Sequence, residues 1–251
     1  MRIHKPCNLL RPGSACFFLD VDGTLLEFGP TPDAVGVHAE LLQLLVDVAA
    51  ACEGALALIS GRSLPQLDAL FGPRQWPAAG LHGAQRRDAR GRLHVHPGDP
   101  IPDQIRDALT QLAASQPGVL LEDKGPAIAV HYRLAPVNIE TELRQRIDRL
   151  VATYAHGALQ VQPGAYVLEL KPAGATKARA IEQFLLEAPF ADRRPIFAGD
   201  DLTDLDGFAT VERHAGLSIA VGPRVRAMLN LPSPDDLHAL LREFLEAGIA
   251  A

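Results

Sequence analysis

The stretch Ala15-Cys16-Phe17-Phe18-Leu19-Asp20-Val21-Asp22-Gly23-Thr24 decides the fold class. Its first five residues form a continuous apolar run, which is typical of a strand buried on both faces of a parallel sheet. A second apolar run, residues 55–59, ends in Ser60-Gly61-Arg62, and an amphipathic helix is predicted between the two runs over residues 38–52. Strand, helix and strand in this order predict a parallel sheet with helices on its faces.

The pattern changes at a segment rich in proline and glycine, residues 97–102. Beyond it, a helix followed by two strands is predicted twice: residues 103–115, 119–122 and 127–132, then 138–154, 159–162 and 166–170. The α/β alternation then resumes, with a helix over 176–186, strands over 195–198 and 218–221, and a last helix that begins at Ser233 and Pro234. The sequence therefore predicts an α/β fold: a doubly wound, mostly parallel sheet in a core domain (1–102 and 173–251) with an inserted, smaller α+β domain (103–172).

Composition excludes several classes of function. The 251 residues are 47% hydrophobic and 22% charged, which is ordinary globular composition. The net charge of −6 argues against nucleic-acid binding through a broad positively charged surface. No apolar run approaches the roughly 18 residues of a membrane span. The N-terminal segment lacks the apolar core of a secretory signal, and three widely spaced cysteines favour a reducing compartment. We therefore expect a cytoplasmic protein with no nucleic-acid or membrane partner, whose oligomeric state is left open and is compatible with a monomer.

Acidic residues follow two of the predicted strands. Asp20 and Asp22 are two residues apart, so in extended chain their carboxylates point to the same side. The second group, Gly199-Asp200-Asp201-Leu202-Thr203-Asp204, follows another strand, and the ligand crevice of an open parallel sheet lies at these strand ends. An ordinary turn or an acidic helix N-terminus could explain either group alone. Two such groups at one sheet edge instead predict a magnesium site, because Mg²⁺ prefers oxygen ligands.

Four further positions suit a phosphate group. Ser60 and Arg62 offer a hydroxyl and a guanidinium to phosphate oxygens, and Gly23 allows a tight turn with exposed backbone N–H groups. Lys177 lies in a predicted first helical turn, where a solvated lysine is the ordinary alternative. Near two acidic groups, the same lysine could neutralise the charge of a phosphate and of a nucleophile.

Together these residues resemble the four motifs of the haloacid dehalogenase-like phosphatase superfamily. The motifs occur in order as Asp20-x-Asp22-Gly23-Thr24, Ser60, Lys177 and Gly199-Asp200-Asp201, and the inserted segment resembles the α/β cap found between the second and third motifs. The resemblance implies that Asp20 attacks phosphorus and forms an aspartyl-phosphate. It implies that Asp22 protonates the leaving oxygen and then activates water, and that Ser60 and Lys177 hold the phosphoryl oxygens. Mg²⁺ would be held by the Asp20 carboxylate, the Asp22 backbone carbonyl and Asp200.

Five more stretches resemble the trehalose-6-phosphate phosphatase family within that superfamily: residues 58–62, 79–84, 122–125, 131–133 and 200–204. Two positions depart from the pattern, since Leu81 and Ala178 stand where many relatives have glutamate and glycine. Neither change removes a group needed for phosphoryl transfer. The resemblance implies a Mg²⁺-dependent enzyme that hydrolyses trehalose 6-phosphate to trehalose and phosphate.

The same resemblance assigns the remaining site residues. It implies phosphate or substrate contacts by ten residues: Gly23, Thr24, Gly61, Arg62, His82, Gly83, Lys124, His131, Arg133 and Glu169. Asp201 and Asp204 would contact the metal-binding and catalytic residues and not the metal or the substrate. The alternative for the four residues of the inserted domain is the polar face of a half-exposed sheet. Alternative functions are a phosphatase of sucrose 6-phosphate or mannosyl-3-phosphoglycerate, and a non-catalytic sugar-phosphate sensor.

Overall fold

The computed structural model describes residues 13–27, 36–98, 100–164 and 166–249. The chain divides into two compact units, one formed by Met1–His94 with Thr176–Ala251 and the other by Val95–Ala175. The N-terminal segment, on which the expectation about a secretory signal rests, lies outside the described residues, as does Cys7, one of the three cysteines.

The first unit contains an eight-stranded sheet in the order β12-β11-β10-β1-β2-β3-β4-β5. Neighbouring strands from β12 to β3 pair in parallel, and β4 joins β3 antiparallel. This confirms the expected mostly parallel sheet. The strands are β1 (Ala15–Leu19), β2 (Leu56–Ile59), β3 (Ala78–Gly80), β4 (Gln85–Arg87), β5 (Leu93–Val95), β10 (Arg194–Gly199), β11 (Leu217–Val221) and β12 (Leu229–Leu231).

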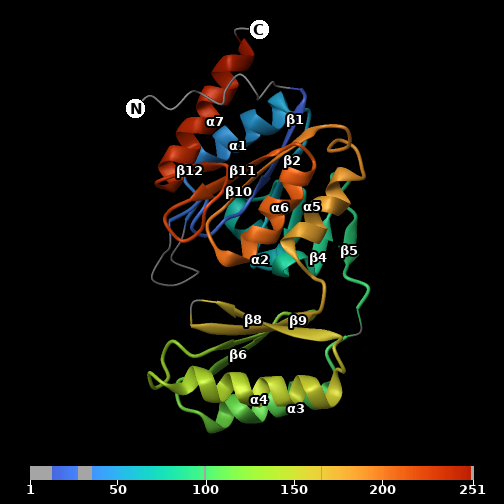
Figure 1. Cartoon of the computed structure of the whole chain (residues 1–251), viewed down its shortest axis with the longest axis vertical. Coiled ribbons are helices and arrows are strands. Elements are labelled where there is room, and N and C mark those ends of the chain that lie inside the picture. Colours follow the sequence, from blue (N-terminus) through green and yellow to red (C-terminus); the bar gives the residue numbers. More distant parts are fainter. Residues whose placement is uncertain (1–12, 28–35, 99, 165, 250–251) are drawn as a thin grey trace. The chain divides into compact units, whose positions relative to one another are not determined.

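Helices cover both faces of this sheet (Figure 1). They are α1 (Ala39–Ala51), α2 (Leu64–Phe71), α5 (Lys177–Leu185), α6 (Leu205–Arg213) and α7 (Pro234–Ile249), with short 3₁₀ turns η3 (Leu81–Gly83) and η4 (Leu202–Asp204). Adjacent residues of β1 point to opposite faces, and Phe17 packs on Phe244 of α7 whereas Phe18 packs on Phe184 of α5. The apolar run that predicted β1 is therefore fully buried because it contributes to the core on both sides.

The second unit is a four-stranded antiparallel sheet, in the order β6-β7-β9-β8, with two helices on one face (Figure 1). Its elements are α3 (Asp103–Ser115), β6 (Leu120–Asp123), β7 (Ile128–His131), α4 (Ile139–Tyr154), β8 (Leu159–Gly164) and β9 (Val167–Pro172). Apolar residues of α3 and α4, such as Leu109 and Ile147, pack on Val130 and Leu168 of the sheet in a separate hydrophobic core. This is the α+β arrangement that the repeated helix–strand–strand pattern predicts.

The bounds of the second unit and several short elements differ from the sequence-based expectation. The second unit begins at Val95 instead of residue 103, because Ile101 of the proline-rich segment is buried in the second core and its carbonyl accepts a hydrogen bond from Arg106. Helix α2 was not predicted, although Ser63 and Gln66 form a capping box at its start, which is a recognisable sequence signal.

A core substitution in the second unit tests this packing. Ile147→Ala removes a fully buried side chain, and we expect it to lower the free energy of unfolding of this unit by about 2–5 kcal/mol. Val137→Ala is the control, because Val137 is 98% exposed and its truncation should change stability by less than about 0.5 kcal/mol. Denaturant titration followed by circular dichroism measures both, and equal losses would contradict the packing described.

Candidate active site

A buried lysine joins the two acidic segments of the first unit. Lys177 is the first residue of α5, and the hydroxyl of Thr176 caps this helix by accepting a hydrogen bond from the Arg179 N–H at 3.1 Å. The Lys177 Nζ donates to Asp20 Oδ1 at 2.7 Å and to Asp204 Oδ1 at 2.6 Å. Burial alone lowers the pKa of Lys177, but the two carboxylates outweigh it and raise the pKa. Lys177 is therefore held as a cation and is not the solvated lysine of the alternative interpretation.

Asp204 shapes the loop that follows β10. Its Oδ2 accepts the backbone N–H groups of Asp200 and Asp201, both at 3.0 Å, while its Oδ1 is bound by Lys177. A Cβ on Gly199 would overlap the Asp204 carboxyl, so the loop closes only around glycine. Asp201 caps the following turn by accepting the Leu202 N–H. Because both Asp204 oxygens are engaged, Asp204 supports its neighbours and is poorly placed to be a metal ligand.

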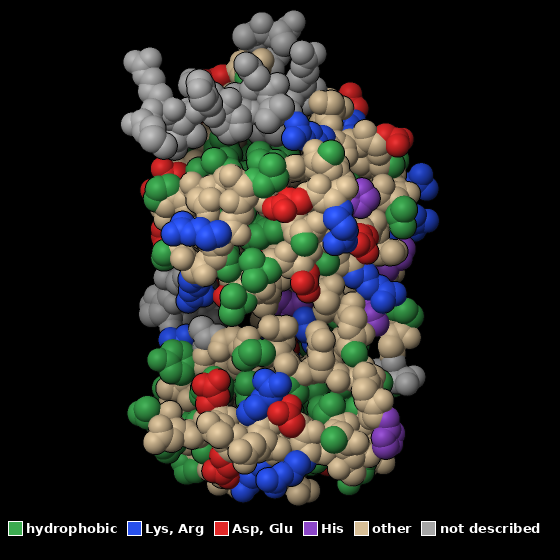
Figure 2. Space-filling model, viewed as in Figure 1, with side chains coloured by type: hydrophobic (Ala, Val, Ile, Leu, Met, Phe, Trp, Pro, Cys, Tyr) green, Lys and Arg blue, Asp and Glu red, His purple; other side chains and the backbone are tan. Residues whose placement is uncertain are grey.

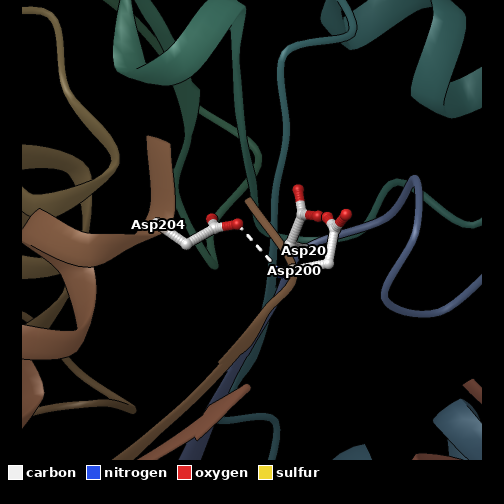
Figure 3. Close-up of side chains that lie close together, drawn as sticks. All are labelled: Asp20, Asp200 and Asp204. Atoms are coloured by element: carbon white, nitrogen blue, oxygen red, sulfur yellow. Dashed lines mark hydrogen bonds between the residues drawn. The ribbon is translucent and has the colours of Figure 1, made fainter. Parts of the chain in front are cut away.

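Three carboxylates gather at the ends of β1 and β10 (Figure 3). Oxygen atoms of Asp20, Asp200 and Asp204 lie within 4.8 Å of one another, and all three residues are buried. With Lys177 as counter-charge, three ionised carboxylates leave a net charge of −2, which suits a divalent cation. Burial, with further contributions from neighbouring carboxylates, raises the pKa of Asp20 to about 6 and that of Asp200 to about 8. Asp20 and Asp200 thus have carboxylate oxygens that could hold a metal ion, and their role as ligands stays a prediction.

The turn after β1 contains two of the residues expected to contact phosphate or substrate, Gly23 and Thr24. The Gly23 N–H donates to the Leu26 carbonyl at 2.7 Å, so it is not an exposed donor for an anion. Thr24 is fully buried, and its hydroxyl donates to Asp20 Oδ2 at 3.0 Å and lies 3.5 Å from Asp200 Oδ1. Thr24 therefore holds the two carboxylates next to each other. The sequence could not predict that this hydroxyl contacts Asp200, because the two residues are far apart along the chain.

Asp22 and Arg62 form a two-point ion pair. Arg62 Nε and Nη2 donate to the two carboxylate oxygens of Asp22 at 2.7 and 2.6 Å. Val21, between the two aspartates, points into the core, as the alternation along extended chain predicts. Arg62 thus contacts the residue expected to carry the proton, in addition to its expected role toward phosphate.

Arg224 is a residue that the sequence reasoning missed. It follows β11, and its Nη1 lies 3.8 Å from Asp200 Oδ2 and 3.9 Å from Asp201 Oδ2. Its position after a predicted buried strand, at the same sheet edge as Asp20 and Asp200, could have identified Arg224 from the sequence. Its guanidinium is half exposed and adds positive charge beside the acidic group.

The remaining predicted residues of the first unit lie on two adjoining loops. Ser60 is buried, and its hydroxyl accepts the Arg62 N–H at 3.1 Å. His82 and Gly83 belong to the turn after β3, and the His82 ring lies against Gly61. The structure therefore brings Ser60, Gly61, Arg62, His82 and Gly83 together within the first unit.

In the second unit, four predicted residues lie on or beside the antiparallel sheet. Lys124 Nζ lies 3.3 Å from Glu169 Oε1, and His131 Nε2 lies 3.0 Å from Glu122 Oε2. The Arg133 guanidinium stands over the Tyr166 ring, 4.9 Å from its centroid. Glu122 was not among the predicted contacts. It lies on β6, two residues before Lys124, and this spacing is the signal that could have identified it.

A doubly wound core with an inserted α+β unit, and an Asp-x-Asp pair beside a buried lysine, are the features expected of the haloacid dehalogenase-like phosphatases. The family model described as Trehalose-phosphatase matches residues 18–229. The trehalose-6-phosphate phosphatase of Escherichia coli (strain K12) is 48% identical over 207 residues, which are 82% of this chain and 77% of the relative. A probable trehalose-phosphate phosphatase of Sinorhizobium fredii is 45% identical, over 89% of this chain and 85% of the relative.

Solved structures agree on the fold. The C-terminal domain of a trehalose-6-phosphate phosphatase from C. albicans gives a TM-score of 0.80 at 19% identity, covering 96% of this chain and 94% of that one. A trehalose-6-phosphate phosphatase related protein gives 0.76 at 24% identity, covering 94% and 99%. The chain belongs to the trehalose-phosphatase family, which confirms the resemblance found in its motifs.

The acidic site predicts an unusual dependence of stability on pH. The raised pKa values of Asp20 and Asp200 mean that the folded state keeps protons that the unfolded state has lost between about pH 4 and 8. The free energy of unfolding should therefore fall as pH rises through this window when metal has been removed. We expect the thermal midpoint of chelator-treated protein to drop between pH 5 and 8 by more than that of Asp200→Asn. Identical pH profiles for the two proteins would contradict the raised pKa of Asp200.

Proposed function

We propose that this protein is a phosphoric monoester hydrolase that converts trehalose 6-phosphate to trehalose and phosphate, a step of trehalose biosynthesis. Its family and the named activity of its relatives support this substrate. The observation that carries the chemistry is the Lys177 ammonium between Asp20 and Asp204, beside the Asp200 carboxylate. Such a cluster keeps one carboxylate ionised at the end of a parallel strand, where it can act as a nucleophile.

In the first step the Asp20 carboxylate attacks phosphorus, and the bond between phosphorus and the sugar oxygen breaks. Asp22 gives its proton to that oxygen, so trehalose leaves as the alcohol and Asp20 becomes an aspartyl-phosphate. In the second step Asp22 takes a proton from water, whose oxygen attacks the same phosphorus. Inorganic phosphate leaves, and the Asp20 carboxylate is restored.

The neighbouring residues orient these groups. Thr24 and Lys177 each bond one oxygen of Asp20, which fixes the plane of the nucleophile. Lys177 and Ser60 supply a charge and a hydroxyl for the phosphoryl oxygens. To reach the sugar oxygen, the Asp22 carboxyl gives up one of its two hydrogen bonds from Arg62 and forms one with that oxygen instead.

A divalent cation, which we propose to be Mg²⁺, would be held by the carboxylates of Asp20 and Asp200 and by the Asp22 backbone carbonyl. When bound, it neutralises charge on the phosphoryl oxygens. When Asp20, Asp200 and Asp204 are all ionised and Lys177 is protonated, these groups carry a net charge of −2, which favours a divalent ion over a monovalent one. The chemistry of an all-oxygen donor set favours Mg²⁺ over softer metals.

The second unit is proposed to recognise the sugar. A disaccharide presents many hydroxyl groups, and charged side chains bind them most strongly. Lys124 and Glu169 form a close pair that can both donate to and accept from hydroxyls, and His131 and Arg133 lie on or next to β7. We assign substrate contact to these four residues.

The expected partner is the small-molecule substrate alone, in the cytoplasm, and a monomer suffices for this chemistry. On the face shown in Figure 2, Lys and Arg side chains are interspersed with acidic ones and form no broad basic surface. Among the described helices, none combines the length and apolar character needed to cross a membrane. The thiols of Cys16 and Cys52 are free and buried, which suits a reducing compartment.

A phosphate-release panel tests the function. With Mg²⁺ present, we expect trehalose 6-phosphate to be hydrolysed faster than sucrose 6-phosphate, glucose 6-phosphate or mannosyl-3-phosphoglycerate. Asp20→Asn removes the attacking oxygen, so its release of phosphate should fall to background while its circular dichroism spectrum stays that of the wild type. A wild type inactive on all four substrates would favour a sensor, and an active Asp20→Asn variant would refute the mechanism.

The role of the second unit is tested by Lys124→Ala. A hydrogen bond to a charged group contributes about 1.5–3 kcal/mol, or roughly one to two powers of ten in kcat/KM. We expect a loss of that size on trehalose 6-phosphate and little change on a small aryl phosphate, which has no sugar hydroxyls to bind. Arg144→Ala, an exposed ion-paired residue of α4, is the control and should change neither rate. Parallel losses on both substrates would show that Lys124 supports the fold instead.

A further inference from the structure

The turn between β3 and β4, Leu81–Gly83, is left-handed at three successive residues. The backbone angle φ is 51° at Leu81, 53° at His82 and 99° at Gly83. Leucine and histidine rarely adopt such values, because their Cβ atoms crowd a carbonyl oxygen. Surrounding structure must therefore hold the turn in this conformation, which is a frequent property of functional sites.

One side of the turn is fixed to the loop that carries Ser60. The Leu81 N–H donates to the Arg62 carbonyl and the His82 N–H donates to the Ser60 carbonyl, both at 3.0 Å. The His82 ring packs directly on Gly61, where an added Cβ would stand 2.7 Å from Nε2. The loop can approach the turn this closely only because residue 61 has no side chain.

The other side of the turn contacts the start of α5. A Cβ on Gly83 would stand 2.5 Å from the carbonyl oxygen of Thr176, the residue that precedes Lys177. That carbonyl accepts the Ala180 N–H at 3.1 Å and so belongs to the first turn of the helix. A displacement of Thr176 would therefore move Lys177 as well.

We propose that the Leu81–Gly83 turn is a positioning element that fixes the Ser60 loop against the N-terminus of α5, so that Ser60 and Lys177 bind one phosphoryl group. His82 then acts through Gly61 and is a positioning residue, not a substrate contact. The inference rests on the roles of Ser60 and Lys177 in the proposed function, and adds the element that sets their spacing. A purely structural turn would affect the unfolding temperature but not the phosphate affinity of the folded protein.

Gly83→Ala tests this proposal against a matched control. Gly91 has φ 79° and nothing within 4 Å of an added Cβ, so Gly91→Ala carries a similar left-handed cost without a contact. We measure kcat and KM for trehalose 6-phosphate, affinity for orthovanadate and thermal midpoint, all with Mg²⁺. Misplacement of a reacting group by about 1 Å can cost about 100-fold, so Gly83→Ala should lose about ten- to hundredfold in kcat/KM and bind vanadate more weakly. Gly91→Ala should match the wild type in both.

A second pair of variants tests the contact with His82. Gly61 has no positive φ, and the three atoms nearest to a Cβ added there all belong to the His82 ring, so Gly61→Ala introduces crowding against that ring. Asparagine tolerates left-handed backbone and is shorter than histidine, so His82→Asn should make room for the new Cβ. We expect Gly61→Ala to lose kcat/KM and vanadate affinity, and the double variant to recover part of both. Multiplicative losses in the double variant would overturn the proposed contact, because independent sites add in free energy.

The outcomes separate this inference from the function on which it rests. If the wild type hydrolyses trehalose 6-phosphate and Gly83→Ala equals Gly91→Ala in rate and vanadate affinity, the turn is only structural and the inference is overturned. If the wild type hydrolyses no trehalose 6-phosphate, the proposed substrate is refuted instead. Vanadate affinity still tests the turn in that case, because it does not depend on the sugar.

Discussion

The Lys177 ammonium lies between two buried carboxylates, those of Asp20 and Asp204, at 2.7 and 2.6 Å. Removing such charges from water costs several kcal/mol per ion unless they are paired and hydrogen-bonded. This pairing joins the end of β1, the start of α5 and the turn after β10, which are far apart in sequence. Without the lysine, the carboxylates would face one another uncompensated. The ion pair is therefore a condition for folding this sheet edge as well as for any chemistry there.

The lysine does not balance all of the negative charge. Asp200 contacts the Thr24 hydroxyl at 3.5 Å and the half-exposed Arg224 at 3.8 Å, which are long distances for compensating a buried carboxylate. Its pKa of about 8 expresses this deficit, since burial and the nearby Asp20 both oppose its charge. Without a bound cation, the repulsion among these carboxylates therefore lowers the stability of the folded protein, and a bound cation would raise it. Ligand binding to the folded state alone adds to stability, so metal and fold are thermodynamically linked.

Long, regular elements of this fold could be predicted from sequence, whereas short ones could not. Strand β1 and helix α3 have the predicted bounds. Five consecutive apolar residues are a strong signal for the strand, and apolar residues at helical spacing over 13 residues are a strong signal for the helix. Strands β3, β4 and β12 have three residues each, too few for a period to emerge. Of the site, the predicted gathering of Asp20, Ser60 and Asp200 at one sheet edge follows from strand direction. Strand direction does not place Lys177, which is the first residue of helix α5. The hydrogen bonds of Thr24 and Asp204 depend on partners whose relative positions only the folded chain defines.

The turn at Leu81 and His82 shows a stronger limit, because the local sequence opposes the observed conformation. Neither residue type favours positive φ, so propensity rules predict a different backbone there. What fixes the turn is contact with Gly61 and Thr176, and both contacts are close approaches that a side chain would block. The same holds at Gly199 beside Asp204. Sequence rules thus identify which chemical groups reach the sheet edge, since that depends on strand order. The spacing between those groups is set by non-local backbone contacts at glycine, and small changes at such positions alter the site without altering its chemistry.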